Sequence, residues 1–326
     1  MKHVRRCAVF SLMMLAVLAT LAGNAAAQWS PSRPVRVVVP FAAGGGADLV
    51  VRRIAERMKE EIGQPFIVDN RPGAGTAIGA VAVAKSPADG HSLLLATSTT
   101  LCVNPILRAN LPYQVEDFAP VAAMQLLPFM VLAPKELPVN SFRELLDYAR
   151  QRPGKLNYGT LGIGSANHVL GGLLSRSAKV DIVPLHYASA APILVALTQG
   201  DVHLYFDGIS TSVPRVKNGQ LKGLAVTGKE RIEALPGIPT VGELGYPELA
   251  LSVWYGLVAP ARTPPEVVER LNAAVNKVMG AREIVTALAD EGTRGLRISP
   301  QEFAQLIRDD TAVWRKAIEP LQLKLE

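Results

Sequence analysis

The stretch that most constrains the fold of this chain runs over Val35–Asp48 and reads VRVVVPFAAGGGAD. Val35–Val39 is a β-branched run typical of a strand buried on both faces, and Pro40 cannot continue its hydrogen-bond ladder. Gly44–Gly46 allow positive φ and a close approach of a ligand to the backbone. Asp48 opens an amphipathic helical pattern. This pattern predicts an anion-binding turn at a helix start, with a tight β–α turn as the alternative.

Two further strand–helix units follow the first. Phe66–Asn70 predicts a strand that runs into a second glycine-rich loop, and Ser92–Ala96 predicts a third strand. Three such units in a row indicate an α/β protein with a parallel sheet and helices on both faces. Ligands of such sheets bind beyond the carboxyl ends of the strands. Small or polar residues fill those ends, which are 41–46, 70–76 and 97–100.

A second group of units follows residue 133. The apolar run Met124–Ala133 predicts a strand that leaves one domain for another, and Leu251–Ala259 predicts the strand that returns. Between them, Gly159–His168 is another glycine-rich turn at a helix start, and Val202–Phe206 predicts a strand that ends at Asp207. The remaining predicted strands are 155–158, 182–186 and 221–227, and the remaining predicted helices are 141–150, 190–199, 213–218, one from 264, 281–291 and 300–319.

Residues 1–27 predict a signal peptide. Basic residues precede the apolar segment Cys7–Leu21, and Ala25–Ala27 is a small-residue cleavage site. We therefore expect the mature chain to begin at Gln28 after export. A retained membrane anchor is the alternative, although the apolar segment is short for a span. Cleavage leaves Cys102 as the single cysteine, which excludes an intrachain disulfide.

Charge and composition give no case for nucleic-acid binding. Without the leader, 31 basic and 28 acidic residues remain, a formal charge of +3. The basic residues are scattered along predicted helices, whereas a nucleic-acid site needs a clustered basic face with stacking aromatics. The histidines show no metal-ligand spacing, so we expect no metal site.

Enzyme motifs are weak in this sequence. Gly73, Gly75 and Gly79 resemble a dinucleotide fingerprint, but the spacing is wrong and the next strand ends in Thr97 instead of an acid. Cys102 could be a nucleophile, yet no histidine stands at a supporting distance in the sequence, and a small buried thiol is the commoner case. We expect no cofactor and no catalytic residue.

Three polar residues have more than one interpretation. Asp48 would repel a carboxylate ligand, so it caps its helix, orients neighbouring N–H groups or favours a ligand with an amine. His168 lies in the first turn of a predicted helix and serves either a ligand site or packing. Asp207 follows a buried strand and either caps the next turn or contacts a ligand. His186 and His203 alternate with apolar residues inside strands, which favours structural roles.

Nearly the whole mature chain resembles the Bug-family receptors, the extracytoplasmic solute-binding components of tripartite tricarboxylate transporters. The residues that carry the resemblance occur in order along the chain: Pro40-Phe41 to Asp48, Asn70-Arg71-Pro72-Gly73-Ala74-Gly75, Asp89-Gly90, Asn104-Pro105, Leu111-Pro112-Tyr113, Phe118-Ala119-Pro120-Val121, Gly164-Ser165 with His168, Phe206-Asp207, Trp254-Tyr255-Gly256-Leu257, Ala259-Pro260 and Thr263-Pro264.

The resemblance implies a two-domain periplasmic binding protein of the type II, Venus-flytrap kind, with two crossing strands. The first domain would combine 28–126 with 250–326, and the second would hold 127–249. Closure of two lobes on a small anion needs N–H donors and no catalytic residue. The implied partners are a small carboxylate ligand and integral-membrane transporter subunits, and we expect a monomer in the periplasm.

We expect the ligand to lie against the strand ends of both domains. Two departures from the family pattern leave the kind of carboxylate open, because Ala47 replaces a common Thr and Ala188-Ser189 replace a common Lys-Gly. The predicted ligand-binding residues are Phe41, Ala43, Gly44, Gly45, Asp48, Gly75, Thr76, Ser98, Thr99, Gly164, Ser165, His168, Ser189 and Asp207.

Three functions remain open at this point. The first is a receptor that captures a small carboxylated metabolite and delivers it to a membrane transporter. The second is a ligand sensor whose closed form docks on a membrane sensor kinase. The third is an exported enzyme on the same fold, which the absence of a nucleophile–base pair disfavours.

Overall fold

The computed structural model describes residues 29–323 and Leu325, and the signal peptide predicted over 1–27 lies outside them. From Pro31 onward the chain forms one compact unit. Its strands follow the order β2-β1-β3-β9-β4-β7-β5-β6, with β8 and β10 also paired to β4. No helix within the described ranges has the length and apolarity to cross a membrane.

The first strand–helix units form the parallel sheet that the sequence predicts. β1 (Val35–Val39) lies between β2 (Phe66–Asn70) and β3 (Ser92–Thr97), and both pairings are parallel. Four of the five β1 side chains are buried, as expected for a strand covered on both faces. α2 (Gly46–Ile62) and α3 (Ala77–Ala84) connect these strands.

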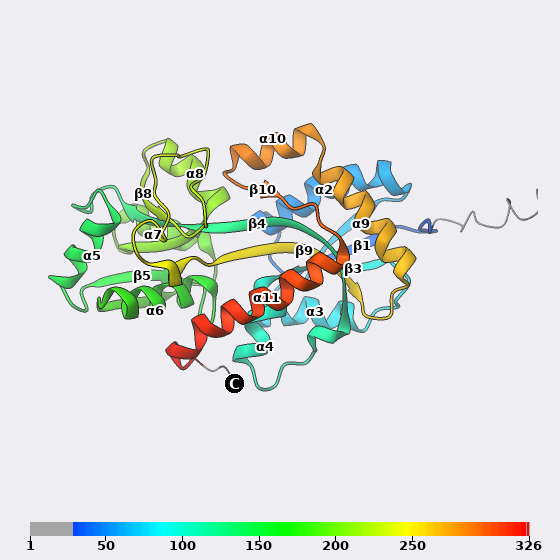
Figure 1. The fold of residues 1–326 in the computed structure, drawn as a ribbon, viewed down its shortest axis with the longest axis horizontal. Coiled ribbons are helices and arrows are strands. Elements are labelled where there is room, and N and C mark those ends of the chain that lie inside the picture. The colour runs from blue at the N-terminus through cyan, green and yellow to red at the C-terminus, as the bar shows by residue number, and fades with distance from the viewer. Residues whose placement is uncertain (1–28, 324, 326) are drawn as a thin grey trace, which may run out of the picture. The chain divides into compact units, whose positions relative to one another are not determined.

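Two long antiparallel strands continue the sheet into its second half (Figure 1). β4 (Phe118–Pro134) pairs with β9 (Ser252–Pro260) through Pro128, and from Phe129 onward it pairs with β7 and β8. These are the two crossing strands that the sequence predicts. β4 starts six residues earlier than expected, because a register shift between Pro120 and Ala122 lets the proline lie inside a strand.

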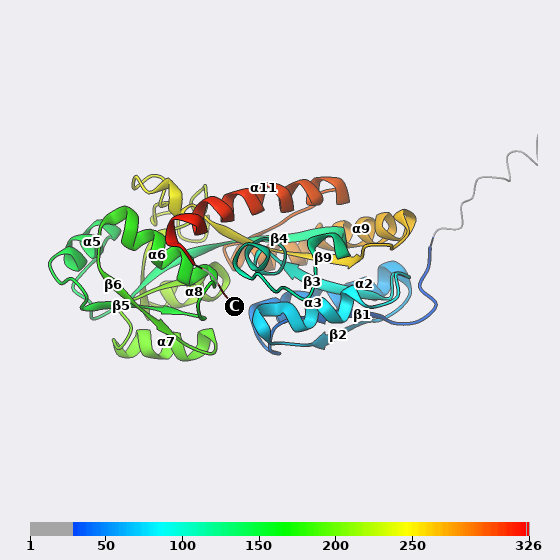
Figure 2. The same ribbon diagram turned by 90° about the horizontal axis from the view of Figure 1, so that it is seen from below.

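The second half repeats the strand–helix plan. β5 (Leu156–Thr160) pairs in parallel with β6 (Ile182–His186) and β7 (Leu204–Gly208), and β8 (Leu221–Val226) lies on β4. Figure 2 shows α6 and α7 on opposite sides of β5 and β6. The helices of this half are α5 (Phe142–Arg150), α6 (Ala166–Ala178), α7 (Ala190–Gln199) and α8 (Ile209–Lys217).

Glycines allow α6 and α7 to approach β5 from its two faces. A Cβ on Gly171 of α6 would lie 2.0 Å from the Tyr158 ring, and a Cβ on Gly159 would lie 2.2 Å from Ile193 of α7. Tyr158 and Gly159 are neighbours in β5, so they point to opposite faces. The alternation therefore fixes one helix on each side of the strand.

The C-terminal helices cover the crossing strands. α9 (Pro265–Met279), α10 (Arg282–Asp290) and the short β10 (Arg294–Gly295) precede α11 (Pro300–Ile318). The Asp310 carboxylate of α11 accepts hydrogen bonds from the indole N–H groups of Trp254 at 2.8 Å and Trp314 at 3.2 Å. Cys102 is fully buried beside α11, with its Sγ 3.6 Å from the Ile307 carbonyl oxygen. Burial raises the pKa of this thiol, which agrees with the expected packing role.

Candidate functional site

Asp48 organises the first glycine-rich loop. Its side chain is 1% exposed and accepts hydrogen bonds from the Gly44 N–H at 2.8 Å, Arg52 Nε at 2.9 Å and Asn70 Nδ2 at 3.0 Å. Asn70 also donates to the Phe41 carbonyl at 3.1 Å. Burial alone would raise the pKa of Asp48, but these donors hold it below its ordinary value. Arg52 compensates the charge that would otherwise repel an anion.

The rest of the first glycine-rich loop is accessible to a ligand. Residues 43–46 are exposed, and Gly45 caps α2 without a side-chain hydrogen bond. The N–H groups of the first helical turn have no acceptor four residues earlier in the helix. Gly44 has a φ of +82°, which turns the chain into the helix. The loop therefore presents backbone N–H groups at the positive end of a 17-residue helix.

The second glycine-rich loop, over residues 70–76, is held by a buried polar network. Thr100 Oγ1 donates to Thr76 Oγ1 at 3.0 Å, Asn104 Nδ2 donates to the Gly75 carbonyl at 2.7 Å, and the Tyr113 hydroxyl donates to the Thr100 carbonyl at 2.6 Å. Thr76 has a φ of +81°, an uncommon value for a β-branched residue. The network stabilises this strained turn, whose Gly75 is exposed and whose Thr76 is buried.

Ser98 and Thr99 differ in accessibility. Ser98 is fully buried, and its hydroxyl accepts a hydrogen bond from the Trp254 N–H at 3.2 Å. Thr99 is partly exposed and begins a π-helical turn over Thr99–Val103, which leads into α4 (Asn104–Leu107). The sequence predicted only a polar strand end here. π-helical turns are frequent at functional sites, and this one places α4 beside the second loop.

The third glycine-rich loop, within Gly159–His168, ends at Ser165, which caps α6. Gly162 and Gly164 have φ values of +105° and +80°, and the Ser165 Oγ donates to the Gly162 carbonyl at 2.7 Å. The same oxygen accepts from the His168 N–H at 3.4 Å. Gly164 is buried, because Leu107 of α4 and Leu325 lie against it. The Gly164 N–H faces His168 Nδ1 at 3.4 Å.

His168 and His186 lie side by side at the ends of α6 and β6. Their ring centroids are 5.6 Å apart, and His186 Nδ1 lies 2.9 Å from Thr160 Oγ1. Burial and then the neighbouring His186 lower the pKa of His168. The strand pattern assigned His186 a structural role, but the residue is exposed. The pattern misses this because His186 is the last residue of its strand.

Asp207 lies at the end of β7 and is 2% exposed. Its Oδ2 accepts hydrogen bonds from Thr211 Oγ1 at 2.7 Å and Ser212 Oγ at 3.1 Å, both in the first turn of α8. Burial raises the pKa of Asp207 to about 6. These contacts tie Asp207 to the start of α8 without capping the helix, and a ligand contact remains a prediction. Ser189, the residue before α7, is exposed and makes no side-chain cap hydrogen bond.

Four side chains that support these loops are not among the residues that the sequence predicts for the ligand site. Arg52 and Asn70 complete the Asp48 cluster, and Asn104 and Tyr113 support the second loop. Asn70 could have been selected, because it ends a strand next to a glycine-rich loop. Arg52 gives no such signal, since its i, i+4 spacing from Asp48 is common on helices.

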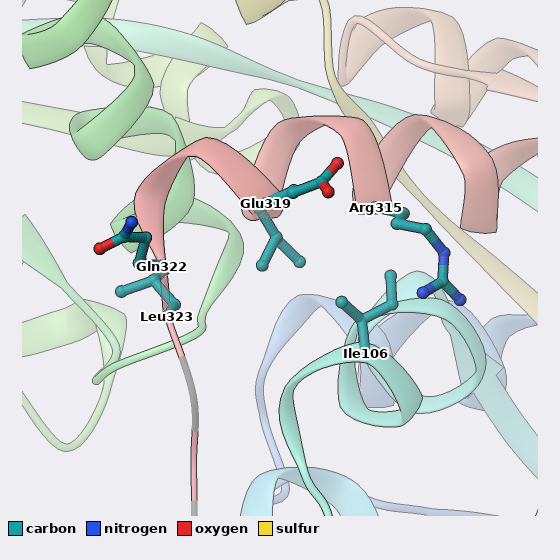
Figure 3. Close-up of a pocket in the computed structure, with 6 residues that line it drawn as sticks. Ile106, Arg315, Glu319, Gln322 and Leu323 are labelled. Carbon is teal, nitrogen blue, oxygen red and sulfur yellow. The ribbon is translucent and has the colours of Figure 1, made fainter.

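A cavity of about 600 Å³ lies beside α4 and α11. Figure 3 shows Arg315 reaching from α11 toward Ile106 of α4. This cavity contains none of the predicted ligand residues. It is lined by Ile106, Arg315, Ile318, Glu319, Gln322 and Leu323.

Two half-sheets joined by crossing strands, with glycine-rich turns at strand ends, define a two-lobe solute-binding protein. The chain belongs to the tripartite tricarboxylate transporter family of receptors, whose sequence model matches residues 50–323. Protein BugT of Bordetella pertussis is 32% identical over 330 residues, which cover 100% of both chains. Members of this family are substrate-binding receptors rather than enzymes.

Two solved relatives carry ligands. The structure of R. palustris Rpa4515 with adipate has a TM-score of 0.83 and 36% identity, and the match covers 89% of this chain and 97% of that one. The structure of MatC from Rhodopseudomonas palustris with bound malate has a TM-score of 0.80 and 34% identity, covering 88% and 99%. Both ligands are small dicarboxylates.

Proposed function

We propose that this protein captures a small carboxylated metabolite between two lobes and delivers it to the integral-membrane subunits of a tripartite tricarboxylate-type transporter. The lobes comprise residues 28–126 with 250–326 and residues 127–249. The chain is exported, its leader is cleaved after about Ala27, and it acts in the periplasm as a monomer. The relatives with adipate and malate support a carboxylate ligand.

One observation carries the proposal. The exposed residues Gly45 and Gly46 begin α2, whose first-turn N–H groups have no acceptor within the helix, and the neighbouring Asp48 carboxylate is already compensated by Arg52 at 2.9 Å. A carboxylate placed there gains hydrogen bonds and the helix dipole without meeting an unpaired negative charge. α6 has a second glycine-rich helix start, which Ser165 caps. Donors on both sides suit a ligand that draws two lobes together.

The direct test is a screen for stabilising ligands. Several donors around one carboxylate give a dissociation constant near 1 μM, about −8 kcal/mol. A ligand at one hundred times its dissociation constant then adds about 2.7 kcal/mol to the free energy of unfolding. Thermal-shift measurements with dicarboxylates, citrate-like acids, aromatic acids and amino acids should find at least one such ligand. A flat response to every acid would contradict the proposed function.

Gly45→Val tests whether the α2 loop holds the ligand. Gly45 has an ordinary φ of −79°, and an added Cβ would meet only the Ala42 carbonyl at 3.6 Å. The variant should therefore fold, but its branched side chain covers the N–H groups and should weaken binding at least tenfold in calorimetry. Gly237→Val is the matched control, because Gly237 is also exposed and has open space around it.

A further inference from the structure

Arg108 lies at the junction between the second loop and the C-terminal tail. It directly follows α4 in an extended conformation, and its N–H donates to the Asn104 carbonyl at 2.9 Å. Its backbone forms a β-bridge with Leu325. The preceding residue, Leu107, contacts Gly164 of the third loop. Arg108 is therefore one residue from the contact between α4 and the α6 helix start.

The guanidinium lies against the open side of Gly75. Arg108 Nη2 is 3.1 Å from the position that a Gly75 Cβ would occupy, and Asn104 Oδ1 is 3.6 Å from the same position. Gly75 is exposed, and its φ of +60° is one that glycine adopts readily. The missing side chain at Gly75 is what lets the guanidinium approach the second loop.

Within the part of the chain that the structure describes, Arg108 has no anionic partner. Its Nε is buried without a hydrogen bond, and its side chain makes no hydrogen bond or ion pair anywhere in residues 29–323 or with Leu325. By contrast, Arg52, Arg53 and Arg71 each pair with a carboxylate. Arg108 is half-buried, and its guanidinium offers a fixed fork of N–H donors and no acceptor, so an anion with two oxygens is the partner that suits it.

We propose that Arg108 binds a second carboxylate of the ligand, which makes the captured metabolite a dianion. This inference rests on the proposed function. The planar guanidinium matches a carboxylate through two parallel N–H···O bonds. The ligand's other carboxylate lies at a glycine-rich helix start, where backbone N–H groups already suffice for one negative charge. Arg108 thus distinguishes a diacid from a monoacid of similar length.

Calorimetry with matched acids tests this role. The diacids are adipate and malate, and their monoacid counterparts are hexanoate and 2-hydroxybutyrate, in which a methyl group replaces one carboxylate. The unmodified protein should prefer at least one diacid to its counterpart by tenfold or more. Arg108→Gln should lower the affinity for that diacid at least tenfold and leave the monoacid affinity unchanged. Arg108→Lys, which keeps the charge without the fork, should give an intermediate loss.

Two further variants test whether the diacid preference depends on the place of the Arg108 charge beside Gly75 or on positive charge in general. Arg315→Gln removes the same charge from α11, where Arg315 points toward Ile106 (Figure 3), and should leave the preference for the diacid intact. Gly75→Ala keeps the Arg108 charge but places a Cβ 3.1 Å from Nη2, so it should weaken diacid binding. If Arg108→Gln does not fold, Arg108→Lys and Gly75→Ala still test whether Arg108 binds the second carboxylate.

The outcomes distinguish the two proposals. Equal diacid affinity in the unmodified protein, Arg108→Gln and Gly75→Ala overturns the role of Arg108 and leaves the receptor function standing. A protein that binds diacid and monoacid equally well also overturns it. Absence of binding to any carboxylate overturns the receptor function together with this inference.

Discussion

At the scale of single residues, two buried carboxylates have opposite electrostatic effects. Asp48 accepts hydrogen bonds from Arg52, Gly44 and Asn70, which favour its charged form. Asp207 accepts hydroxyl hydrogen bonds from Thr211 and Ser212, which do not offset the effect of its burial on the pKa. Asp48 therefore stabilises the fold as an anion, whereas Asp207 opposes folding when it is ionised.

Asp48→Asn should lower the free energy of unfolding by about 1–3 kcal/mol at pH 7, because it weakens charge-assisted hydrogen bonds to the loop. The folded-state pKa of Asp48 lies below its ordinary value of 3.8, so its contribution is present above that value and is lost as pH falls below it. Urea unfolding between pH 3 and pH 7 measures the difference. Asp201→Asn is the control, since Asp201 is exposed. Equal effects of both variants would contradict the bracing role of Asp48.

Asp207→Asn should have the opposite effect. The folded-state pKa of Asp207 is raised to about 6, so its favourable contribution is complete below the ordinary value of 3.8 and is lost as pH rises through 6. The asparagine keeps an acceptor for Thr211 and Ser212 and should stabilise the protein by roughly 1–3 kcal/mol at pH 8. The gain should shrink toward pH 5. Unchanged carboxylate affinity in this variant would limit Asp207 to its contacts with the start of α8.

At the scale of elements, the glycine-rich loops before α2 and α6 differ in helix capping, because Gly45 offers no side-chain cap whereas Ser165 does. Ser165 and Ser299 cap α6 and α11 in the same way, each accepting the N–H of the residue three positions later. Only Ser165 follows a glycine-rich loop at a strand end. A comparison of variants at Ser165 and Ser299 can therefore distinguish an effect on stability, which both caps should have, from an effect on ligand binding, which only Ser165 should have.

Ser165→Ala and Ser299→Ala should each lower the free energy of unfolding by about 1–2 kcal/mol, since each removes a helix cap. Only Ser165→Ala should also weaken carboxylate binding, by several-fold in calorimetry, because it loosens the loop around Gly162 and Gly164. Equal affinity in both variants would show that the α6 start serves structure alone.

The sequence predicted most elements, because their periodicity and turn residues are local signals. It missed the early start of α8 at Ile209, where the buried Asp207 accepts from Thr211 and Ser212 and makes the polar segment helical. It also missed the π-helical turn over Thr99–Val103, which has no distinctive pattern. Partners such as Asn70 for Asp48 come from different strand ends, so only the folded chain shows the pairing.

At the scale of the whole molecule, β4 carries the connection between the half-sheets. Its first part pairs with β9 and its last part with β7 and β8, so one continuous strand belongs to both half-sheets. Register shifts in β4 lie at Pro120/Ala122, Ala123/Gln125 and Val131/Leu132. Bulges bend a strand locally, so a movement of the two lobes would be taken up at such positions.

The contact of Leu107 and Leu325 with Gly164 offers the sharpest test of lobe closure. A Cβ on Gly164 would lie 2.5 Å from Leu107 Cδ1 and 3.1 Å from Leu325 Cδ1, so Gly164→Ala should displace both side chains and disturb the contact between the two surfaces. It should weaken carboxylate binding at least tenfold and reduce the ligand-induced fall in radius of gyration measured by X-ray scattering. Gly245→Ala is the matched control, because Gly245 has a similar φ of +88° with open space around it. Both variants carry the backbone strain of alanine at positive φ, which costs about 1–2 kcal/mol. Only the first has the steric contact, so normal binding and compaction in Gly164→Ala would contradict closure at this contact.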